Sequence, residues 1–191
     1  MEAVEKEIVR LLTSDKEVNK GFQLLLDNYQ KKLYFFVRRM VLSHDDTHDI
    51  LQDSFIRILN GIRSFRGESS LSTWLHAVAY REALKHLNRK KKITLVEWNE
   101  QVWINMQQLE VDSHFDGDKI QLLLQACVAA LPEKQRAVFV FKYYNELKYE
   151  EISVITGTSV GALKASYHHA VEKISCSIEK QNFSWSDYEK K

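Results

Sequence analysis

The chain has 191 residues, of which 45% are hydrophobic and 28% charged, with six glycines and one proline. This length and apolar content allow one large or two small cores and exclude a wholly disordered chain. The formal net charge of +1 conceals an uneven distribution of charge along the chain. Residues 1–92 carry 17 Lys/Arg and 12 Asp/Glu, and residues 119–191 carry 10 Lys/Arg and 8 Asp/Glu. Between them, residues 93–118 carry 6 acidic residues and no Lys or Arg. Two mildly basic parts separated by an acidic stretch indicate a polyanionic partner.

The initial segment, MEAVEKEIVRLLTSDKE, is charged throughout and lacks the apolar core of a signal peptide. No apolar run approaches the length of a membrane span. We therefore expect a soluble, cytoplasmic protein with no direct membrane insertion. Because glycine and proline are scarce and apolar residues recur at steps of three and four, the pattern predicts an all-α fold.

Three helices are predicted in the first 92 residues. Apolar residues from Val18 to Met40 predict a helix over 17–42, and the segment SHDD predicts a second, capped by Ser43 and ending near residue 60. After the turn FRGESS, Ser70 or Ser72 can cap a third helix that ends in four consecutive cations. Its inward stripe is predicted to be Trp74, Leu75, Val78, Ala79, Ala83 and Leu87, and its outer side Tyr80, Arg81, Lys85, Asn88 and Arg89.

Residues 93–117 lose the helical pattern and indicate an acidic linker with some local structure. A second helical unit follows over 118–182, in which Pro132 opens a helix, and helices are predicted over 149–156 and 159–181. Residues 183–191 form a tail. The predicted architecture is two small helical domains joined by a flexible acidic linker.

The segment YEEISVITGTSVGALKASYHHAVEKI has the features of a helix-turn-helix. Gly157 can supply a left-handed turn and Ser159 can cap the second helix, which could enter a DNA major groove. A plain helical hairpin in a bundle is an equally good interpretation of this pattern alone. The outer side of the second helix carries residues able to contact phosphates and base edges: Gly161, Lys164, Ala165, His168 and His169.

The third helix combines aromatic and basic residues in a pattern suited to separated nucleic-acid strands, because flat rings stack on bases and cations bind the backbone. In the alternative interpretation, Trp74 is a core residue and the cations form a solvated helix end. The candidate residues are Phe65, Trp74, Tyr80, Arg81, Lys85 and Arg89.

The segment HDDTHDILQDSFIRIL places His44 and His48 at i and i+4 among several aspartates. A metal site would need ligands from other helices, and no matching pattern occurs elsewhere, so an acidic contact face is favoured and no metal is expected. The sequence contains no activated nucleophile and no phosphate-binding loop. We expect no catalytic residues, no cofactor and no enzymatic activity.

The ordered set of segments resembles the extracytoplasmic-function (ECF) sigma factors of the sigma-70 family, over about residues 22–174. The resemblance implies that Asp46, Asp49, Gln52 and Asp53 dock on core RNA polymerase. It also implies that residues 65–92 recognise and help to open the minus-ten element of promoter DNA, and that the last helix reads the minus-thirty-five element. An anti-sigma factor is a further partner implied by the family.

The chain departs from the family pattern at several of these positions. The family often has Asn at the position of Arg81, Ser-Arg at Ala165-Ser166, and Arg at His169. Two alternative functions also fit the motifs: a stand-alone helix-turn-helix regulator that binds duplex DNA, and a helical binding module that contacts no nucleic acid.

Overall fold

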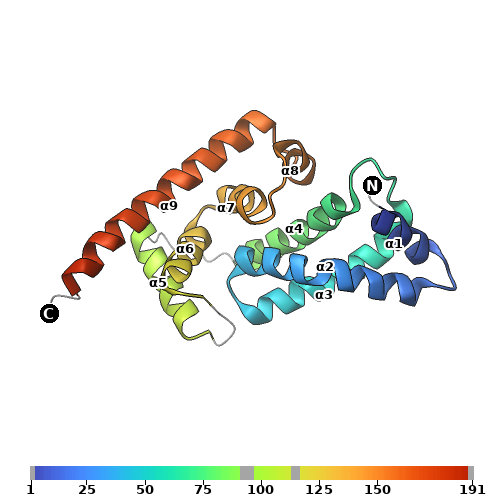
Figure 1. The fold of residues 1–191 in the computed structure, drawn as a ribbon, viewed down its shortest axis with the longest axis horizontal. Helices are drawn as coiled ribbons and strands as arrows, with labels where there is room; N and C mark the ends of the chain where they lie inside the picture. Colours follow the sequence, from blue (N-terminus) through green and yellow to red (C-terminus); the bar gives the residue numbers. More distant parts are fainter. Residues whose placement is uncertain (1–2, 91–96, 113–116, 189–191) are drawn as a thin grey trace.

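The computed structural model describes residues 3–90, 97–112 and 117–188, with side chains described up to residue 179. All regular structure in these ranges is helical, so the predicted all-α class is confirmed. Figure 1 shows α1–α4 towards one end of an elongated molecule and α5, α6 and the end of α9 towards the other, with α7 and α8 between them and α8 against α4. The elements are α1 (Ala3–Thr13), α2 (Val18–Val41), α3 (His44–Gly61), the 3₁₀ turn η1 (Ile62–Ser64), α4 (Leu71–Lys90), α5 (Trp98–Glu110), α6 (Lys119–Ala130), α7 (Glu133–Phe139), the π-helical turn η2 (Val140–Tyr144), α8 (Tyr149–Thr156) and α9 (Val160–Tyr188).

The α2, α3 and α4 helices pack on one another around an apolar core. Both α2 and α3 begin and end within one residue of the predicted positions. The Ser43 hydroxyl accepts a hydrogen bond from the Asp46 backbone N–H at 3.3 Å, and the Ser70 hydroxyl accepts one from the Thr73 N–H at 3.0 Å. The local capping signals therefore set these two helix starts as predicted.

An additional helix, α1, precedes the predicted elements and lies against α2. It buries Ile8, Leu11 and Leu12, and the two helices approach so closely that a Cβ atom at Gly21 would lie 2.7 Å from the backbone nitrogen of Leu12. Glycine is therefore required at this crossing. No helix was predicted over this charged segment, because its apolar stripe is short.

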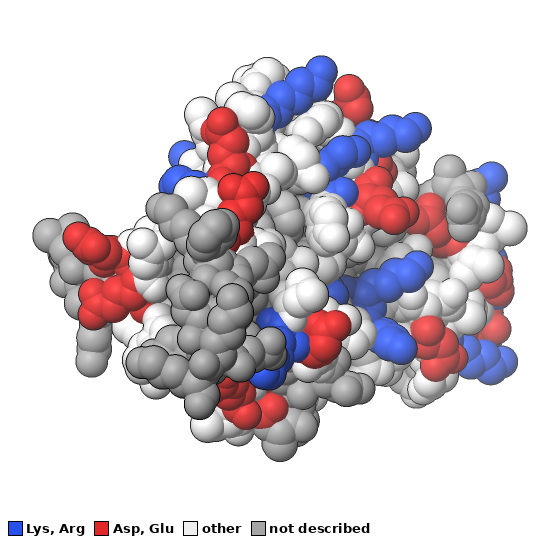
Figure 2. All heavy atoms as spheres, turned by 60° about the vertical axis from the view of Figure 1, so that its left-hand side comes forward, with Lys and Arg blue, Asp and Glu red and all other residues white. Residues whose placement is uncertain are grey.

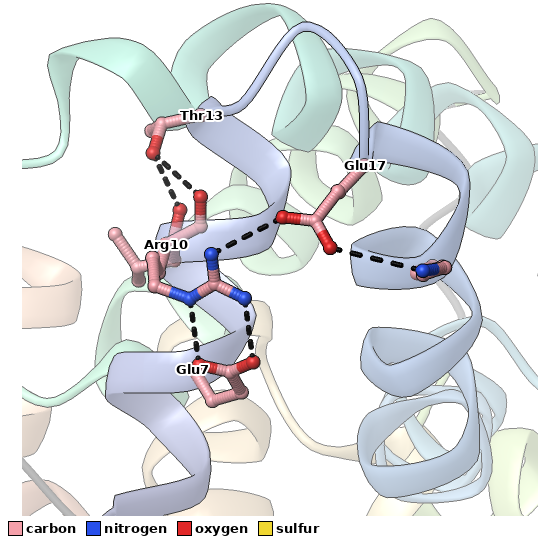
Figure 3. Close-up of polar contacts among 6 residues, drawn as sticks. Glu7, Arg10, Thr13 and Glu17 are labelled. Atoms are coloured by element: carbon pink, nitrogen blue, oxygen red, sulfur yellow. Dashed lines mark hydrogen bonds and ion pairs between the residues drawn. The ribbon is translucent and has the colours of Figure 1, made fainter.

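A polar network joins the end of α1 to the start of α2 (Figure 3). The Arg10 guanidinium donates to Glu7 at 2.9 Å and to Glu17 at 3.2 Å, and Lys20 lies 3.8 Å from the same Glu17 carboxylate. These side chains are mostly exposed, so the pairs orient the two helices rather than contribute much stability.

The α8–α9 pair has the local geometry expected of a helix-turn-helix. Gly157 has a left-handed backbone with φ of 68°, and the Ser159 hydroxyl accepts from the Ala162 N–H at 3.4 Å. Ile152, Ile155 and Leu163 are buried between the helices. The apolar run AVFVF belongs to α7 and η2 and is therefore helical rather than a strand.

The acidic stretch over 93–117 is more ordered than the sequence indicated. Its middle forms α5, which packs against α6, and the Asn105 amide donates to the Ala126 carbonyl at 3.0 Å. The Trp98 indole N–H donates to the Ser177 hydroxyl at 2.7 Å. The expectation of a flexible connector is wrong for Trp98–Glu110, because these contacts with α6 and α9 compensate for a weak helical pattern.

The two ends of the molecule meet through aromatic residues of α2, α4 and η2. The rings of Phe36 and Phe141 stack with centroids 4.6 Å apart, and both side chains are fully buried. His76 and Tyr80 of α4 pack edge-on against Phe141 at 6.2 and 5.7 Å. The Arg136 guanidinium donates to the Met40 carbonyl beside this cluster. The interface is therefore an aromatic cluster with polar contacts beside it.

Candidate polymerase and nucleic-acid interfaces

The four predicted polymerase-docking residues lie along α3, and we call them the α3 acidic face: Asp46, Asp49, Gln52 and Asp53. Three of them are exposed, as a docking surface requires, whereas Asp46 is partly covered by the end of α4. Its carboxylate accepts from the Lys90 ammonium at 2.7 Å and lies 3.3 Å from His86 Nε2. Burial alone would raise the pKa of Asp46, but the hydrogen bond from Lys90 and the charge of His86 lower it overall.

A polar cleft of about 370 Å³ separates α3 from α4. One wall carries Asp49 and Asp53 of the α3 acidic face, and the other carries Lys85 and Arg89 of the predicted strand-binding set. Two predicted surfaces that are distant in sequence thus face each other across one cleft.

Glu82 lies in the wall of this cleft and was not predicted from the sequence. It is buried, forms an ion pair with Arg57 at 2.6 Å and lies 3.6 Å from Lys85. The carboxylate of Glu82 therefore ties α4 to α3 and orients Lys85. Its spacing of three residues from Lys85 was the available signal, but the partner on α3 could not be inferred from one sequence.

The predicted strand-binding residues, which we call the α4 strand face, divide into exposed cations and covered aromatics. Arg81, Lys85 and Arg89 are exposed as predicted. Phe65 and Trp74 are partly buried and contact each other with ring centroids 5.4 Å apart. Trp74 therefore belongs to the packed support of the preceding loop, consistent with the alternative interpretation of this residue as part of the core.

Tyr80 is buried, although it was predicted to be exposed on the outer side of the helix. Only 7% of its surface is exposed, because Phe141 of η2 covers it. Burial raises the pKa of Tyr80, and the negative charge of Glu133 adds to this effect. The placement was wrong because α4 lies between α2 and α3 on one side and the C-terminal helices on the other, so it has two buried faces rather than one.

The first turn of α4 is held by a residue of α1 that was not predicted from the sequence. The Glu5 carboxylate of α1 is buried and accepts from the Ser72 backbone N–H and from the Tyr29 hydroxyl, both at 3.1 Å. Ser72 is in the first turn of α4, so Glu5 satisfies a donor that the helix itself leaves free. Nothing in the local pattern of α1 could have indicated this contact, which spans 67 residues.

The five predicted duplex-binding residues, which we call the α9 outer face, are all exposed on one side of the helix: Gly161, Lys164, Ala165, His168 and His169. Glu172 lies 3.3 Å from the imidazoles of both His168 and His169 and was not predicted. Lys164 is the only Lys or Arg among these residues. Figure 2 likewise shows acidic and basic side chains interspersed on the face it presents, without one large basic patch.

The described ranges contain neither a metal-binding cluster nor a membrane-spanning helix. In these residues, no group of three or more His, Cys, Asp or Glu is arranged to hold a metal ion. His44 and His48 instead contact each other, with ring centroids 4.5 Å apart. In the same residues, no helix combines the length and apolar character needed to cross a membrane.

Models of known families match both ends of the chain. Sigma-70 region 2 matches residues 25–93, and Sigma-70 region 4 matches residues 121–174. This chain belongs to the sigma-70 family. It is a transcription initiation factor that directs RNA polymerase to promoters, as the order of its motifs predicted.

Curated relatives place the sigma factor in the ECF group. It is 28% identical to the ECF RNA polymerase sigma-E factor of Haemophilus influenzae, over 90% of this chain and 93% of that protein. It is 29% identical to the ECF RNA polymerase sigma factor SigW of Bacillus subtilis, over 83% of this chain and 91% of that one.

Two solved structures share its fold. The sigma factor RpoE from Bartonella quintana, determined in complex with the anti-sigma factor NepR, matches with a TM-score of 0.65 and 16% identity, over 84% of this chain and 98% of RpoE. CnrH, determined in complex with the cytosolic domain of CnrY, matches with a TM-score of 0.68 and 15% identity, over 93% of this chain and 98% of CnrH. Helix α1 precedes the region 2 match, so Glu5 lies outside the segment that the family model describes.

Proposed function

We propose that this sigma factor divides promoter recognition among three surfaces. The α3 acidic face binds basic residues of core RNA polymerase, the α4 strand face holds the separated minus-ten strand, and the α9 outer face reads the minus-thirty-five duplex. Residues 1–92 and 118–182 act as the two DNA-recognition domains, residues 93–117 connect them, and residues 183–191 form a tail.

The cleft between α3 and α4 carries this proposal. Because Asp49 and Asp53 line one wall and Lys85 and Arg89 the other, a polymerase helix bound to α3 lies next to the strand that α4 binds. Opening a base step costs a few kcal/mol, and a protein stabilises the open form by trapping the unstacked bases and the strand backbone. Because polymerase docking and strand capture occur on adjacent helices, the free energy of polymerase binding offsets the cost of opening the DNA.

Minus-ten recognition by Tyr80 requires a change at the interface with η2. In the structure its ring lies against Phe141, so a base can stack on it only after η2 moves away. Arg81 is already exposed and stands where the family often has Asn. We infer that Arg81 contributes a charged contact to the strand and alters the minus-ten preference.

An anti-sigma factor is the regulatory partner that we infer. Support comes from the structural relatives RpoE and CnrH, which were determined with an anti-sigma factor and with a cytosolic domain, respectively. Such a partner acts in the compartment of the polymerase, so we propose that this sigma factor functions in the cytoplasm.

Reversal of charge on the α3 acidic face tests the docking assignment. Asp49→Lys combined with Asp53→Lys should abolish co-elution with core polymerase in gel filtration and promoter-dependent transcription, because both positions would repel basic partners. Glu110→Lys on α5 is the control, since this exposed side chain lies outside the face. Undiminished binding of the double variant would refute the assignment. Tight, sequence-specific duplex binding by the protein without polymerase would instead favour the stand-alone regulator.

A further inference from the structure

A cavity of about 610 Å³ lies between α2, α5, α6 and η2, away from the three proposed promoter-recognition surfaces. Its walls come from both family-matched segments, since α2 belongs to region 2 and α6 and η2 belong to region 4. The volume falls within the range of about 300–1,000 Å³ that is typical of small-molecule sites, which often form between domains.

Most of the cavity wall is aromatic or aliphatic. Tyr34 and Phe35 of α2 and Tyr143 and Tyr144 of η2 form two edge-to-face pairs, with centroids 5.4 and 4.9 Å apart, and Leu124 of α6 lies among them. Phe35 and Tyr143 remain 41% and 53% exposed, which is unusual for large aromatic side chains. These walls suit the apolar body of a ligand.

Two arginines line the same cavity. Arg38 is buried and pairs through Nη2 with Asp112, but its Nη1 atom has no hydrogen-bond partner. Arg39 lies over the Tyr144 ring at 3.9 Å and has no carboxylate partner among the described residues. Burial lowers the pKa of Arg39, and its contact with Tyr144 opposes this effect.

We propose that this cavity binds an amphipathic anion. A carboxylate, phosphate or sulfonate head accepts the free Arg38 Nη1–H and pairs with Arg39, and an aromatic or aliphatic body packs on the tyrosine, phenylalanine and leucine side chains. Among the described residues that line the cavity, none is acidic, and the Asp112 carboxylate pairs with Arg38 from outside this lining. Charge-assisted hydrogen bonds from arginine are the strong contacts expected at such a site.

A ligand at this position holds the two ends of the molecule together. Because the complete cavity exists only when α2 packs against α6 and η2, the ligand binds this arrangement more tightly than an opened one. The same arrangement keeps Phe141 on Tyr80. On the basis of the proposed function, the bound anion therefore reduces minus-ten recognition and transcription by this sigma factor.

The test uses 8-anilinonaphthalene-1-sulfonate (ANS), an aromatic sulfonate, titrated by fluorescence against the full chain. Arg39→Met removes the charge, and Leu124→Trp fills the cavity. Each should weaken ANS binding at least fivefold. The control is Trp103→Ala, which removes a 57% exposed aromatic residue of α5 outside the cavity and should leave the affinity unchanged. Equal affinity in the wild type and both cavity variants would overturn the proposal.

Thermal unfolding is a second measurement, and it compares a charged with a neutral ligand on the wild type itself. Decanoate should raise the Tm of the wild type and of Trp103→Ala, whereas neutral 1-decanol should not, and Arg39→Met should lose the shift. Displacement of ANS by monomeric decanoate would identify a free anion, and displacement by phosphatidylglycerol vesicles would identify a lipid head group. If neither displaces ANS, the anion site does not exist.

The effect on transcription is measured separately. Decanoate should lower promoter-dependent transcription at least twofold with the wild type and have no effect with Arg39→Met. The ANS and Tm measurements require neither polymerase nor DNA, so failure of the cavity proposal and failure of the promoter-recognition proposal are distinguishable.

Discussion

The α9 outer face and the α4 strand face differ in how much of each is accessible. Every predicted contact residue of α9 is exposed, and its helix is buried on one side only. On α4 the cations are exposed, but Tyr80 is covered by η2 and Trp74 is packed against Phe65. The surface that we propose to read duplex DNA is therefore fully exposed, whereas the surface that we propose to bind the separated strand is exposed only in part.

This difference follows from what each surface must bind. Duplex DNA presents its groove without rearrangement, so an exposed helix is sufficient. Unstacked bases need flat apolar rings, and such rings bury themselves in the absence of a ligand. Of the aromatic residues that we propose for minus-ten recognition, Tyr80 is buried and Phe65 and Trp74 are partly buried, and the following predictions test how firmly they are held.

The substitution with the largest expected effect is Phe141→Ala, which removes the ring that covers Tyr80. Phe141 is fully buried against Phe36, so the change should lower the free energy of unfolding by about 3–5 kcal/mol. Urea denaturation measures this loss. Phe35→Ala makes the same chemical change at a 41% exposed position and should cost less than half as much. Similar losses for the two variants would show that η2 is not a firm cover of α4.

The next largest effect is expected for Glu5→Ala, which deletes the acceptor at the start of α4. Loss of the contacts with the Ser72 N–H and the Tyr29 hydroxyl should cost about 1–3 kcal/mol in urea denaturation. It should also reduce permanganate reactivity of unpaired thymines in the minus-ten region, while the α9 contact with DNA is retained. Glu5→Gln keeps an acceptor and should restore most of both properties. A Gln variant as defective as the Ala variant would contradict this role.

Acidification tests the covered side of α4 through His76. Burial lowers the pKa of this histidine, with the charge of Lys32 acting in the same direction and the Ser72 carbonyl and Glu151 opposing it. The unfolded chain therefore takes up a proton as the pH falls below about 6.5, and the folded chain does so only at lower pH.

Stability should consequently be greatest above pH 6.5 and decrease below it, with a slope of at most about 1.4 kcal/mol per pH unit for one proton. Denaturation of the wild type and of His76→Gln between about pH 5 and 8, the range in which histidine changes charge, measures this slope. His169→Gln on the exposed α9 face is the control and should keep the wild-type slope. An unchanged slope in His76→Gln would exclude His76 as its source.

The smallest effect is expected for Lys164→Ala on the α9 outer face. This exposed side chain should contribute almost nothing to folding, and its loss should weaken binding of the polymerase complex similarly across promoters. The slope of log affinity against log salt should decrease by about 1. Glu179→Ala, an exposed change farther along α9, should leave that slope unaltered. A loss confined to one base pair would instead make Lys164 a base reader.

Local signals in the sequence were sufficient for the elements that depend on them. Ser43 and Ser159 cap helices as predicted, and Gly157 adopts the left-handed turn. These features involve residues within a few positions of each other. The sigma-70 family could be inferred for the same reason, because its segments are recognisable one by one and in order.

Features that depend on distant contacts could not be predicted in this way. Tyr80 follows the periodicity of an outer position, yet η2 covers it, and α5 is held by Ala126 and Ser177 rather than by its own pattern. The role of Glu5 depends on a helix 67 residues later in the chain. A single sequence gives the faces of helices but does not indicate that one helix has two buried faces.

The π-helical turn η2 has a consequence for how α8 and α9 are oriented. Its backbone closes with a hydrogen bond from the Asn145 N–H to the Val140 carbonyl, five residues back, at 3.2 Å. Such a turn holds one residue more than an α-helical turn, and one residue corresponds to a rotation of about 100° around a helix axis. The extra residue therefore rotates the residues that follow it by about this angle relative to those that precede it. Phe141 of this turn stacks on Phe36, and the chain that leaves the turn leads into α8 and α9.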